Sequence, residues 1–195
     1  MKKSKVIIIG DLIIDRYIHG TVERISPEAP VPIIKQTEII EKLGGAGLVY
    51  DNLLSLWVDV DLFPINDRSV KTRVFVGNQY ITRIDEDCKS DGEKILRSIK
   101  TVDFSKIDYV VLSDYNKGVL DCVQEIIKYI NTFGCKIIVD PKRHSSFYKD
   151  VWLVKPNYKE FYDFEFEKWN SNIIITNADK PVTAFIDGQS YISHV

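Results

Sequence analysis

The chain has 195 residues, of which 45% are hydrophobic and 28% are charged, and this balance excludes a disordered or fibrous protein. Its 26 Lys and Arg residues against 28 Asp and Glu residues give a net charge of −2, which lacks the strong basic field that binding to nucleic acid or to an anionic membrane requires. The length suits one full domain, so we expect a single domain over residues 1–195.

The cysteines and the N-terminus indicate the cellular compartment. Cys88, Cys122 and Cys135 are an odd number without C-x-x-C spacing, which argues against a disulfide framework or a zinc site and favours reduced thiols. The apolar run Val6–Ile9 is too short for the core of a signal peptide, and no run approaches the roughly 18 residues of a membrane helix. We therefore predict a cytoplasmic protein without a membrane segment.

The apolar runs are short, β-branched and regularly spaced. Such runs are typical of the buried strands of a parallel sheet that is covered on both faces. The predicted strands are Lys5–Ile9, Tyr109–Leu112, Lys136–Val139, Val151–Val154 and Asn172–Ile175. Segments with helical spacing lie between them, and the predicted helices are Gly45–Leu56, Asp91–Ile99, Val119–Phe133 and Asn157–Trp169. Strands that alternate with helices predict a doubly wound α/β domain.

Two stretches depart from this alternation. Tyr17–Lys42 contains three prolines and then a long extended run, and Val70–Asp85 has the pattern of a β-hairpin. We predict that they form a small β-layer, or lid, that projects from the α/β body, with segments at about 16–42 and 70–85. A further hairpin is predicted at Val182–Ile192.

Asp11 and Asp15 directly follow the first predicted strand. Ligands of parallel α/β sheets bind beyond the carboxyl ends of the strands, and carboxylates accept hydrogen bonds from sugar hydroxyls. A solvated turn explains the pair equally well. Gly44 and Gly45 open a predicted helix, where glycines let backbone amides approach a ligand, although simple chain geometry also explains a lone Gly-Gly.

Carboxylates also end two successive predicted strands. Asp114 precedes Lys117, and Asp140 precedes Lys142. This arrangement could place charge around a phosphate group or Mg²⁺, and turn chemistry with helix capping is the alternative. Because the pattern occurs at two strand ends, we favour the functional interpretation.

Asn157 and Glu160 follow the predicted strand VWLV. A metal or phosphate role is open to them. An Asn with a Glu three residues later is also the pattern of a helix capping box, which the spacing alone favours. The two roles can coexist.

The motifs, taken together, resemble those of one family. GDLIIDRYIHG, RISPEAPVPIIK and KLGGAG resemble the opening of the ribokinase-like (PfkB) carbohydrate kinases, and above all of their D-glycero-β-D-manno-heptose-7-phosphate kinase branch. KTRVFVGNQYITRID, LSDYNKGVL and IIVDPKRHSSFYKDVWLVKPNYKEF resemble later segments of this branch in the same order. The resemblance implies a reduced ribokinase-like α/β fold, with a mostly parallel sheet flanked by helices and a small β-lid.

This family transfers the γ-phosphate of ATP, with Mg²⁺, to a sugar hydroxyl. The resemblance implies O1 of a heptose 7-phosphate as acceptor, in the making of a lipopolysaccharide precursor. The sugar-binding residues that we expect are Asp11, Asp15, Gly44, Gly45 and Asn52. The residues expected near phosphate and Mg²⁺ are Asp114, Lys117, Asp140, Lys142, Asn157 and Glu160, and no residue is assigned as a direct metal ligand. Lids of such kinases often join two copies, which implies a homodimer.

The chain also departs from the family pattern. It has no Gly-Ala-Gly-Asp motif, whose glycines form the anion hole and whose Asp is the catalytic base, so we assign no catalytic residue. Leu48 replaces the sugar-binding Asn, and Ala178 replaces the glycine of the T-R-G turn. A missing base costs about 10²–10⁴-fold and each missing anion donor about 10²–10³-fold in rate.

These losses lead to two main hypotheses, and a third alternative is that a separate polypeptide supplies the missing half. The first is a shortened sugar kinase homologue with weak or absent ATP-dependent activity, for which the loss of the nucleotide side also puts ATP binding in question. The second is a non-catalytic protein that binds a sugar phosphate, or assists assembly, and dimerises through its lid.

Overall fold

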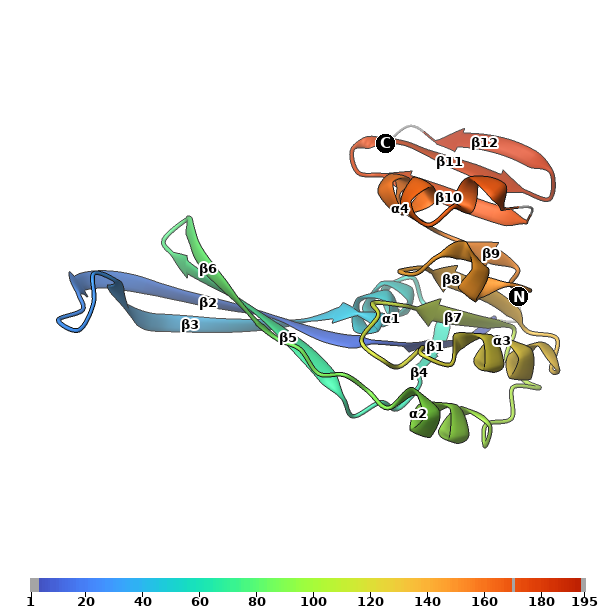
Figure 1. Cartoon of the computed structure of the whole chain (residues 1–195), viewed down its shortest axis with the longest axis horizontal. Helices are drawn as coiled ribbons and strands as arrows, with labels where there is room; N and C mark the ends of the chain where they lie inside the picture. Colours follow the sequence, from blue (N-terminus) through green and yellow to red (C-terminus); the bar gives the residue numbers. More distant parts are fainter. Residues whose placement is uncertain (1–3, 170, 194–195) are drawn as a thin grey trace.

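The computed structural model describes residues 4–169 and 171–193 and contains two β-sheets (Figure 1). The order of strands across the larger sheet is β12 (Gln189–Ser193), β11 (Lys180–Ile186), β10 (Asn172–Asn177), β9 (Leu153–Val154), β8 (Lys136–Asp140), β7 (Tyr109–Ser113), β1 (Lys5–Gly10) and β4 (Asp59–Leu62). The order across the smaller sheet is β3 (Pro32–Gly45), β2 (Leu12–Ile25), β5 (Arg68–Val76) and β6 (Gln79–Glu86). The helices are α1 (Ala46–Ser55), α2 (Gly92–Ile99), α3 (Val123–Asn131) and α4 (Tyr158–Asp163), with short 3₁₀ turns η1 (Ser145–Tyr148) and η2 (Phe166–Lys168).

The larger sheet is mostly parallel. Strands β4, β1, β7, β8, β9 and β10 are parallel to their neighbours, and β11 and β12 form an antiparallel hairpin at one side. The carboxyl ends of β1, β7, β8, β9 and β10 therefore meet at one edge of the sheet. The predicted α/β fold class is confirmed. No helix in the described ranges is long and apolar enough to cross a membrane.

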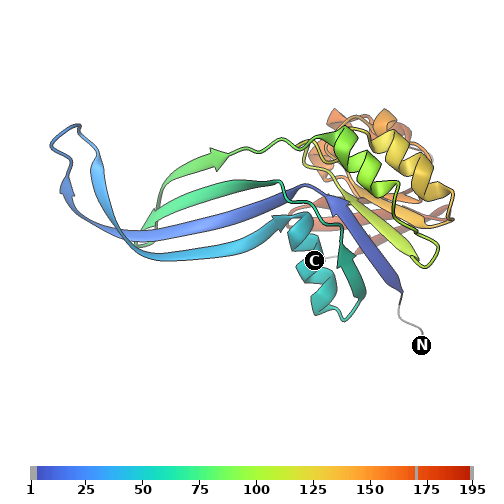
Figure 2. The ribbon, with the colours of Figure 1, turned by 90° about the horizontal axis from the view of Figure 1, so that it is seen from below.

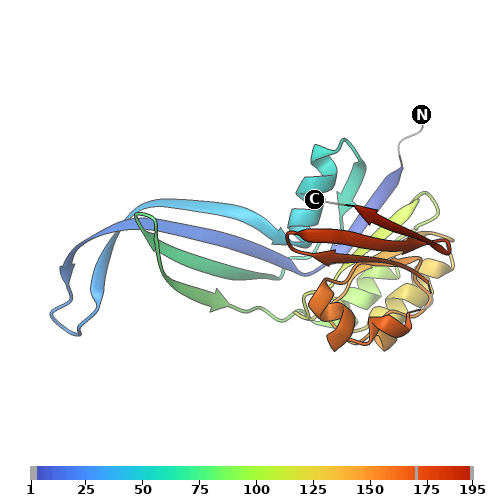
Figure 3. The ribbon, with the colours of Figure 1, turned by 90° about the horizontal axis from the view of Figure 1, so that it is seen from above.

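The core lies on both faces of this sheet. Helices α2 and α3 cover one face, and α1 lies on the other, as the views from below and from above show (Figures 2 and 3). The α2–α3 side contains fully buried Ile9, Leu112 and Ile126. The α1 side is smaller and includes Ile8 and Ala46. These contacts fix the carboxyl edge of the sheet as a rigid platform for side chains.

The smaller sheet is the lid, and its two hairpins extend away from the body (Figure 1). Strand β2 pairs antiparallel with β3 and parallel with β5. The prolines do not interrupt it, because two of them lie in the loop between β2 and β3 and Pro32 is the first residue of β3, a position where the missing N–H is tolerated. The lid strands begin at Leu12, directly after β1, so the body and the lid are joined with almost no linker.

Side chains alternate between the two faces of the lid. One face, here called the Asp15 face, carries the register-matched residues Asp15, Tyr17, Lys42, Lys71 and Arg73. The opposite face, here called the Ile18 face, carries mainly apolar residues together with the ion-paired Arg16, Glu41 and Glu86. It carries Ile14, Ile18, Ile39, Leu43, Val70, Val74 and Ile84.

Three predicted elements need correction. The helix expected over Asn157–Trp169 ends at Asp163, because Glu165 adopts a left-handed conformation (φ 56°) before the η2 turn. The helix expected from Val119 begins at Val123. The strand expected over Val151–Val154 is reduced to Leu153–Val154.

Candidate functional site

A cavity of about 280 Å³ lies at the carboxyl edge of the larger sheet. It is formed by the residues that follow β7, β8 and β9 and by the start of α4. Its lining residues are Asp114, Tyr115, Asp140, Pro141, Lys142, Lys155, Asn157, Glu160 and Thr176. The fold thus brings together Asp114, Asp140, Lys142, Asn157 and Glu160 of the residues predicted near phosphate.

Two ion pairs organise the charges of this cavity. The Lys142 ammonium lies 2.8 Å from Glu160 Oε1, and the Lys155 ammonium lies 3.0 Å from Asp140 Oδ1. The lysine side chains are 48% and 42% exposed, whereas that of Glu160 is 11% exposed. The ammonium groups therefore keep access to solvent, and each has further hydrogen atoms to donate to an anion.

Asn157 and Glu160 form the capping box that their spacing predicts. The Asn157 side chain accepts a hydrogen bond of 2.9 Å from the Glu160 N–H, and Glu160 Oε2 accepts one of 3.0 Å from the Asn157 N–H. Glu160 also holds Lys142 through its other oxygen. The predicted capping box is thus present, and it holds the Glu160 carboxylate at the wall of the cavity.

Asp114 is committed to protein partners. Its carboxylate accepts hydrogen bonds from the Tyr148 hydroxyl (2.8 Å) and the Asn116 N–H (2.7 Å), and Arg143 Nε lies 3.1 Å away. Burial raises the pKa of Asp114, and the contacts with Tyr148 and Arg143 oppose this shift. Asp114 therefore serves as a buried support for the cavity wall.

Lys117 is not among the residues that line the cavity. Its ammonium lies 2.6 Å from Asp87, in the connection between the lid and α2. The structure therefore places Lys117 apart from Lys142 and Lys155, although all three follow strand ends.

Asp11 is buried and acts as an anchor for the loop after β7. Its side chain accepts hydrogen bonds from the N–H groups of Tyr115 (2.8 Å), Lys117 (3.2 Å) and Val119 (3.1 Å), and the residue is 1% exposed. A carboxylate with three backbone donors has few acceptor positions left for a ligand.

Asp15 and the two glycines lie at the base of the lid. Asp15 Oδ1 is 2.5 Å from the Arg73 guanidinium, and a Cβ at Gly44 would come within 2.5 Å of the other Asp15 oxygen. Gly45 has φ 59°, and a Cβ there would lie 2.4 Å from the Asp11 carbonyl oxygen. The glycines are thus needed for the close approach of β3 to β2. Asn52 is exposed on α1.

Tyr115 is a further residue of the cavity wall. Burial raises the pKa of its hydroxyl, with smaller contributions from Asp140, Glu160, Asp15 and Asp11. The sequence did not predict site roles for Tyr115, Lys155, Arg73 or Thr176. For Lys155, its position directly after the predicted strand VWLV was an available signal, whereas nothing local marks Arg73 as the partner of Asp15.

The donor set suits a phosphate group better than a bare metal ion. No three His, Cys, Asp or Glu side chains among residues 4–169 and 171–193 gather closely enough to hold a metal. Mg²⁺ bound together with a phosphate commonly uses only one or two carboxylates and keeps several waters. Asp140 and Glu160 fit that role, and Lys142 and Lys155 fit the phosphate.

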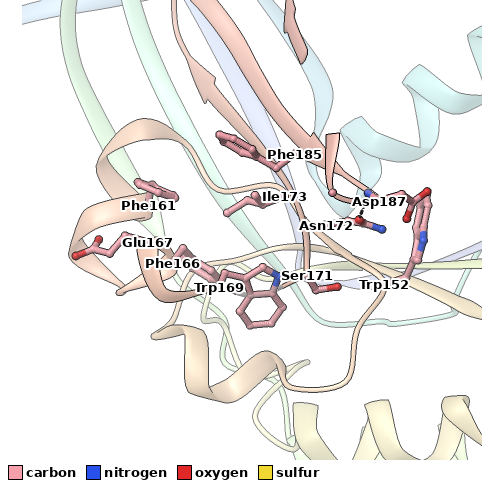
Figure 4. Close-up of a pocket in the computed structure, with 11 residues that line it drawn as sticks. Trp152, Phe161, Phe166, Glu167, Trp169, Ser171, Asn172, Ile173, Phe185 and Asp187 are labelled. Atoms are coloured by element: carbon pink, nitrogen blue, oxygen red, sulfur yellow. Dashed lines mark hydrogen bonds between the residues drawn. The ribbon is translucent and has the colours of Figure 1, made fainter. Parts of the chain in front are cut away.

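A larger cavity of about 710 Å³ lies elsewhere, between the segment after α4 and the β10–β11 hairpin (Figure 4). Five of its eleven lining residues are aromatic, namely Trp152, Phe161, Phe166, Trp169 and Phe185. Size and apolar lining alone would favour it as a ligand site. None of its described lining residues is Lys or Arg, so we assign the phosphate chemistry to the smaller, charged cavity.

The protonation of Asp140 gives a test of the cavity geometry. Burial raises its pKa, and Lys155 opposes the shift. The Asp140 carboxyl of the folded chain therefore keeps a proton that the unfolded chain releases near pH 4. The contribution of this proton to the free energy of unfolding is lost as the pH rises through the pKa of the folded state. We predict that Asp140→Asn removes this loss, so that its stability relative to the wild type increases between pH 4 and pH 7 in urea unfolding. An exposed control, Asp51→Asn, should show no such trend. A difference in unfolding free energy between Asp140→Asn and the wild type that stays constant from pH 4 to pH 7 would contradict the burial of this carboxyl group in the cavity.

Comparisons with known proteins support the sequence resemblance. No protein-family model matches the chain. It is 34% identical over 209 aligned positions to the bifunctional protein HldE of Blochmanniella pennsylvanica, with 91% of this chain and 44% of the relative covered. It is 36% identical over 193 positions to HldE of Sulfurimonas denitrificans, with 80% of this chain and 40% of the relative covered. The chain thus spans about two-fifths of the length of these curated relatives.

Solved structures show the same fold. A carbohydrate kinase from Agrobacterium tumefaciens matches with a TM-score of 0.66 and 13% identity, over 98% of this chain and 76% of that chain. The tetrameric inhibited form of phosphofructokinase-2 from Escherichia coli matches with a TM-score of 0.65 and 12% identity, over 99% of this chain and 80% of that chain. Arabidopsis thaliana ribokinase complexed with ribose and ATP matches with a TM-score of 0.60 and 12% identity, over 100% of this chain and 78% of that chain. The expected ribokinase-like fold is confirmed.

Proposed function

This chain is related to the ribokinase-like (PfkB) carbohydrate kinases, and from that relationship we propose that it binds a sugar phosphate and positions it for phosphoryl transfer with ATP and Mg²⁺. The observation that carries the proposal is the cavity at the carboxyl edge, where Lys142 and Lys155 are held by Glu160 and Asp140 and remain partly exposed. The two ammonium groups donate to phosphate oxygens and reduce the charge that develops during transfer. Magnesium, when bound, would neutralise further phosphate charge beside Asp140 and Glu160.

The Asp15 face of the lid is the proposed sugar side. Asp15 is partly exposed and is oriented by Arg73, so one carboxylate can accept hydrogen bonds from sugar hydroxyls while its position stays fixed. Tyr115 lines the phosphate cavity, and Asp15 is among the charges that raise the pKa of its hydroxyl. The motif RISPEAPVP favours a heptose 7-phosphate as the sugar.

We further propose that the 195-residue chain by itself transfers phosphate slowly or not at all. It contains no Gly-Ala-Gly-Asp segment, which is the motif that supplies base and anion hole in the family. Neither candidate carboxylate replaces that base freely, since Asp114 is held by Tyr148 and Arg143, and Asp140 is held by Lys155. A cytoplasmic location stays a prediction from the cysteine pattern.

A coupled ADP-release assay with heptose 7-phosphate, together with calorimetric titration of the sugar phosphate and of ATP, tests this proposal. We predict a turnover below about 1 s⁻¹, the low end of ordinary enzymes. We also predict sugar-phosphate binding that Lys142→Ala and Lys155→Ala each weaken by about tenfold or more, because each removes a charge-assisted hydrogen bond.

Lys149→Ala is the matched control, since Lys149 is exposed and lines a different cavity. Turnover at or above about 1 s⁻¹ would contradict the proposed impairment. Equal binding by all three lysine variants would contradict the proposed phosphate site.

The alternative function is a non-catalytic sugar-phosphate-binding or assembly protein that forms a homodimer through the lid. What supports it is the mainly apolar Ile18 face, on which Ile39 is 48% and Ile84 is 52% exposed. Sugar-phosphate binding without ATP binding or turnover would favour this alternative over the kinase homologue.

Light scattering during gel filtration tests the lid dimer. Ile39→Lys places a charge on the Ile18 face and is expected to abolish the association through the lid, because an ammonium is costly to bury without a partner. Ile40→Lys is the control, since Ile40 is the next residue of β3 and points to the opposite face. A dimer that both variants leave equally intact would rule out this face as the contact.

A further inference from the structure

Strand β12 is a free edge of the larger sheet. Its only neighbour among the described strands is β11, and all five residues from Gln189 to Ser193 are exposed. An edge strand presents unpaired N–H and C=O groups that can pair with a strand of another chain. The strand also exposes apolar side chains, since Tyr191 is 52% and Ile192 is 64% exposed.

The other three sheet edges carry charges that oppose pairing with a second copy. Edge strand β4 contains Asp59 and Asp61, edge strand β6 contains Arg83, Asp85 and Glu86, and edge strand β3 contains Lys35, Glu38, Glu41 and Lys42. Charges, and lysine above all, are a common protection of edge strands. Strand β12 reads QSYIS and contains no charged residue.

The position of β12 separates it from the lid. The strand lies at the end of the eight-stranded order that is opposite to β1 and β4, whereas the lid continues directly from β1 (Figure 1). An association through β12 therefore does not compete with one through the Ile18 face.

We propose that β12 is a second association surface, at which two copies of this chain join their larger sheets edge to edge. A twofold axis makes such a pair antiparallel and self-complementary. Full overlap of the five-residue strand sets the register, with Tyr191 opposite Tyr191 of the second copy, Gln189 opposite Ser193, and Ser190 opposite Ile192. No charged side chain meets another across this contact, and Tyr191 and Ile192 each lose exposed apolar surface.

Register-specific disulfide cross-linking tests the proposal. In a Cys88→Ser, Cys122→Ser background, Tyr191→Cys is expected to form a covalent dimer under mild oxidation, because directly opposite Cβ atoms of an antiparallel pair lie about 4.5–5.5 Å apart. Gln189→Cys or Ser193→Cys alone should not cross-link, since equivalent residues are then several positions apart. A mixture of the two should form the mixed dimer.

A second measurement uses the association itself. Sedimentation velocity in an Ile39→Lys background, which removes the proposed lid contact, should show that Ile192→Lys reduces the remaining association at least tenfold. Trp57→Lys, at a residue that is 80% exposed outside the sheets, should leave it unchanged. Cross-linking that is equal for all three cysteine variants, or absent for Tyr191→Cys, would overturn the proposal. Association that Ile192→Lys leaves unchanged would overturn it as well.

Discussion

The arrangement of the candidate site depends on the buried carboxylate of Asp11. Its three hydrogen bonds to the N–H groups of Tyr115, Lys117 and Val119 hold the loop after β7 against the end of β1. Hydrogen bonds to a charged group contribute about 1.5–3 kcal/mol each when both partners are buried. Burial of the Asp11 carboxylate without these donors would be costly, because the residue is only 1% exposed. The carboxylate and the conformation of the loop after β7 therefore stabilise each other.

The backbone of the same residue joins the body to the lid. The Asp11 N–H donates to the Ser113 carbonyl, and the Asp11 carbonyl accepts from the Ala46 N–H at the start of α1. Gly45 permits this second contact, since a Cβ there would overlap the Asp11 carbonyl oxygen. One residue thus fixes the β7 loop, the start of α1 and the first residues of the lid, which together separate the proposed sugar side from the phosphate cavity.

Much of the fold follows from local sequence. Continuous β-branched runs located the core strands, and the Asn157–Glu160 spacing located the start of α4. The partners of the acidic residues did not follow, because they are remote in sequence. Asp15 meets Arg73 58 residues away, and Asp11 meets the Val119 N–H 108 residues away. No periodicity encodes such contacts. The helix expected to reach Trp169 was wrong because its helically spaced aromatic residues, such as Phe166, pack into the core from a 3₁₀ turn.

The Asp11 anchor can be measured directly through amide hydrogen exchange of the folded protein. In Asp11→Asn, the amide group of the new side chain cannot accept from all three backbone donors. We predict that exchange at the N–H groups of Tyr115, Lys117 and Val119 accelerates by about tenfold or more, a loss of about 1.4 kcal/mol of local protection. Asp51→Asn, at an exposed site on α1, should leave this exchange unchanged. A folded Asp11→Asn protein with unchanged protection at these three amides would contradict the anchoring role of the Asp11 carboxylate.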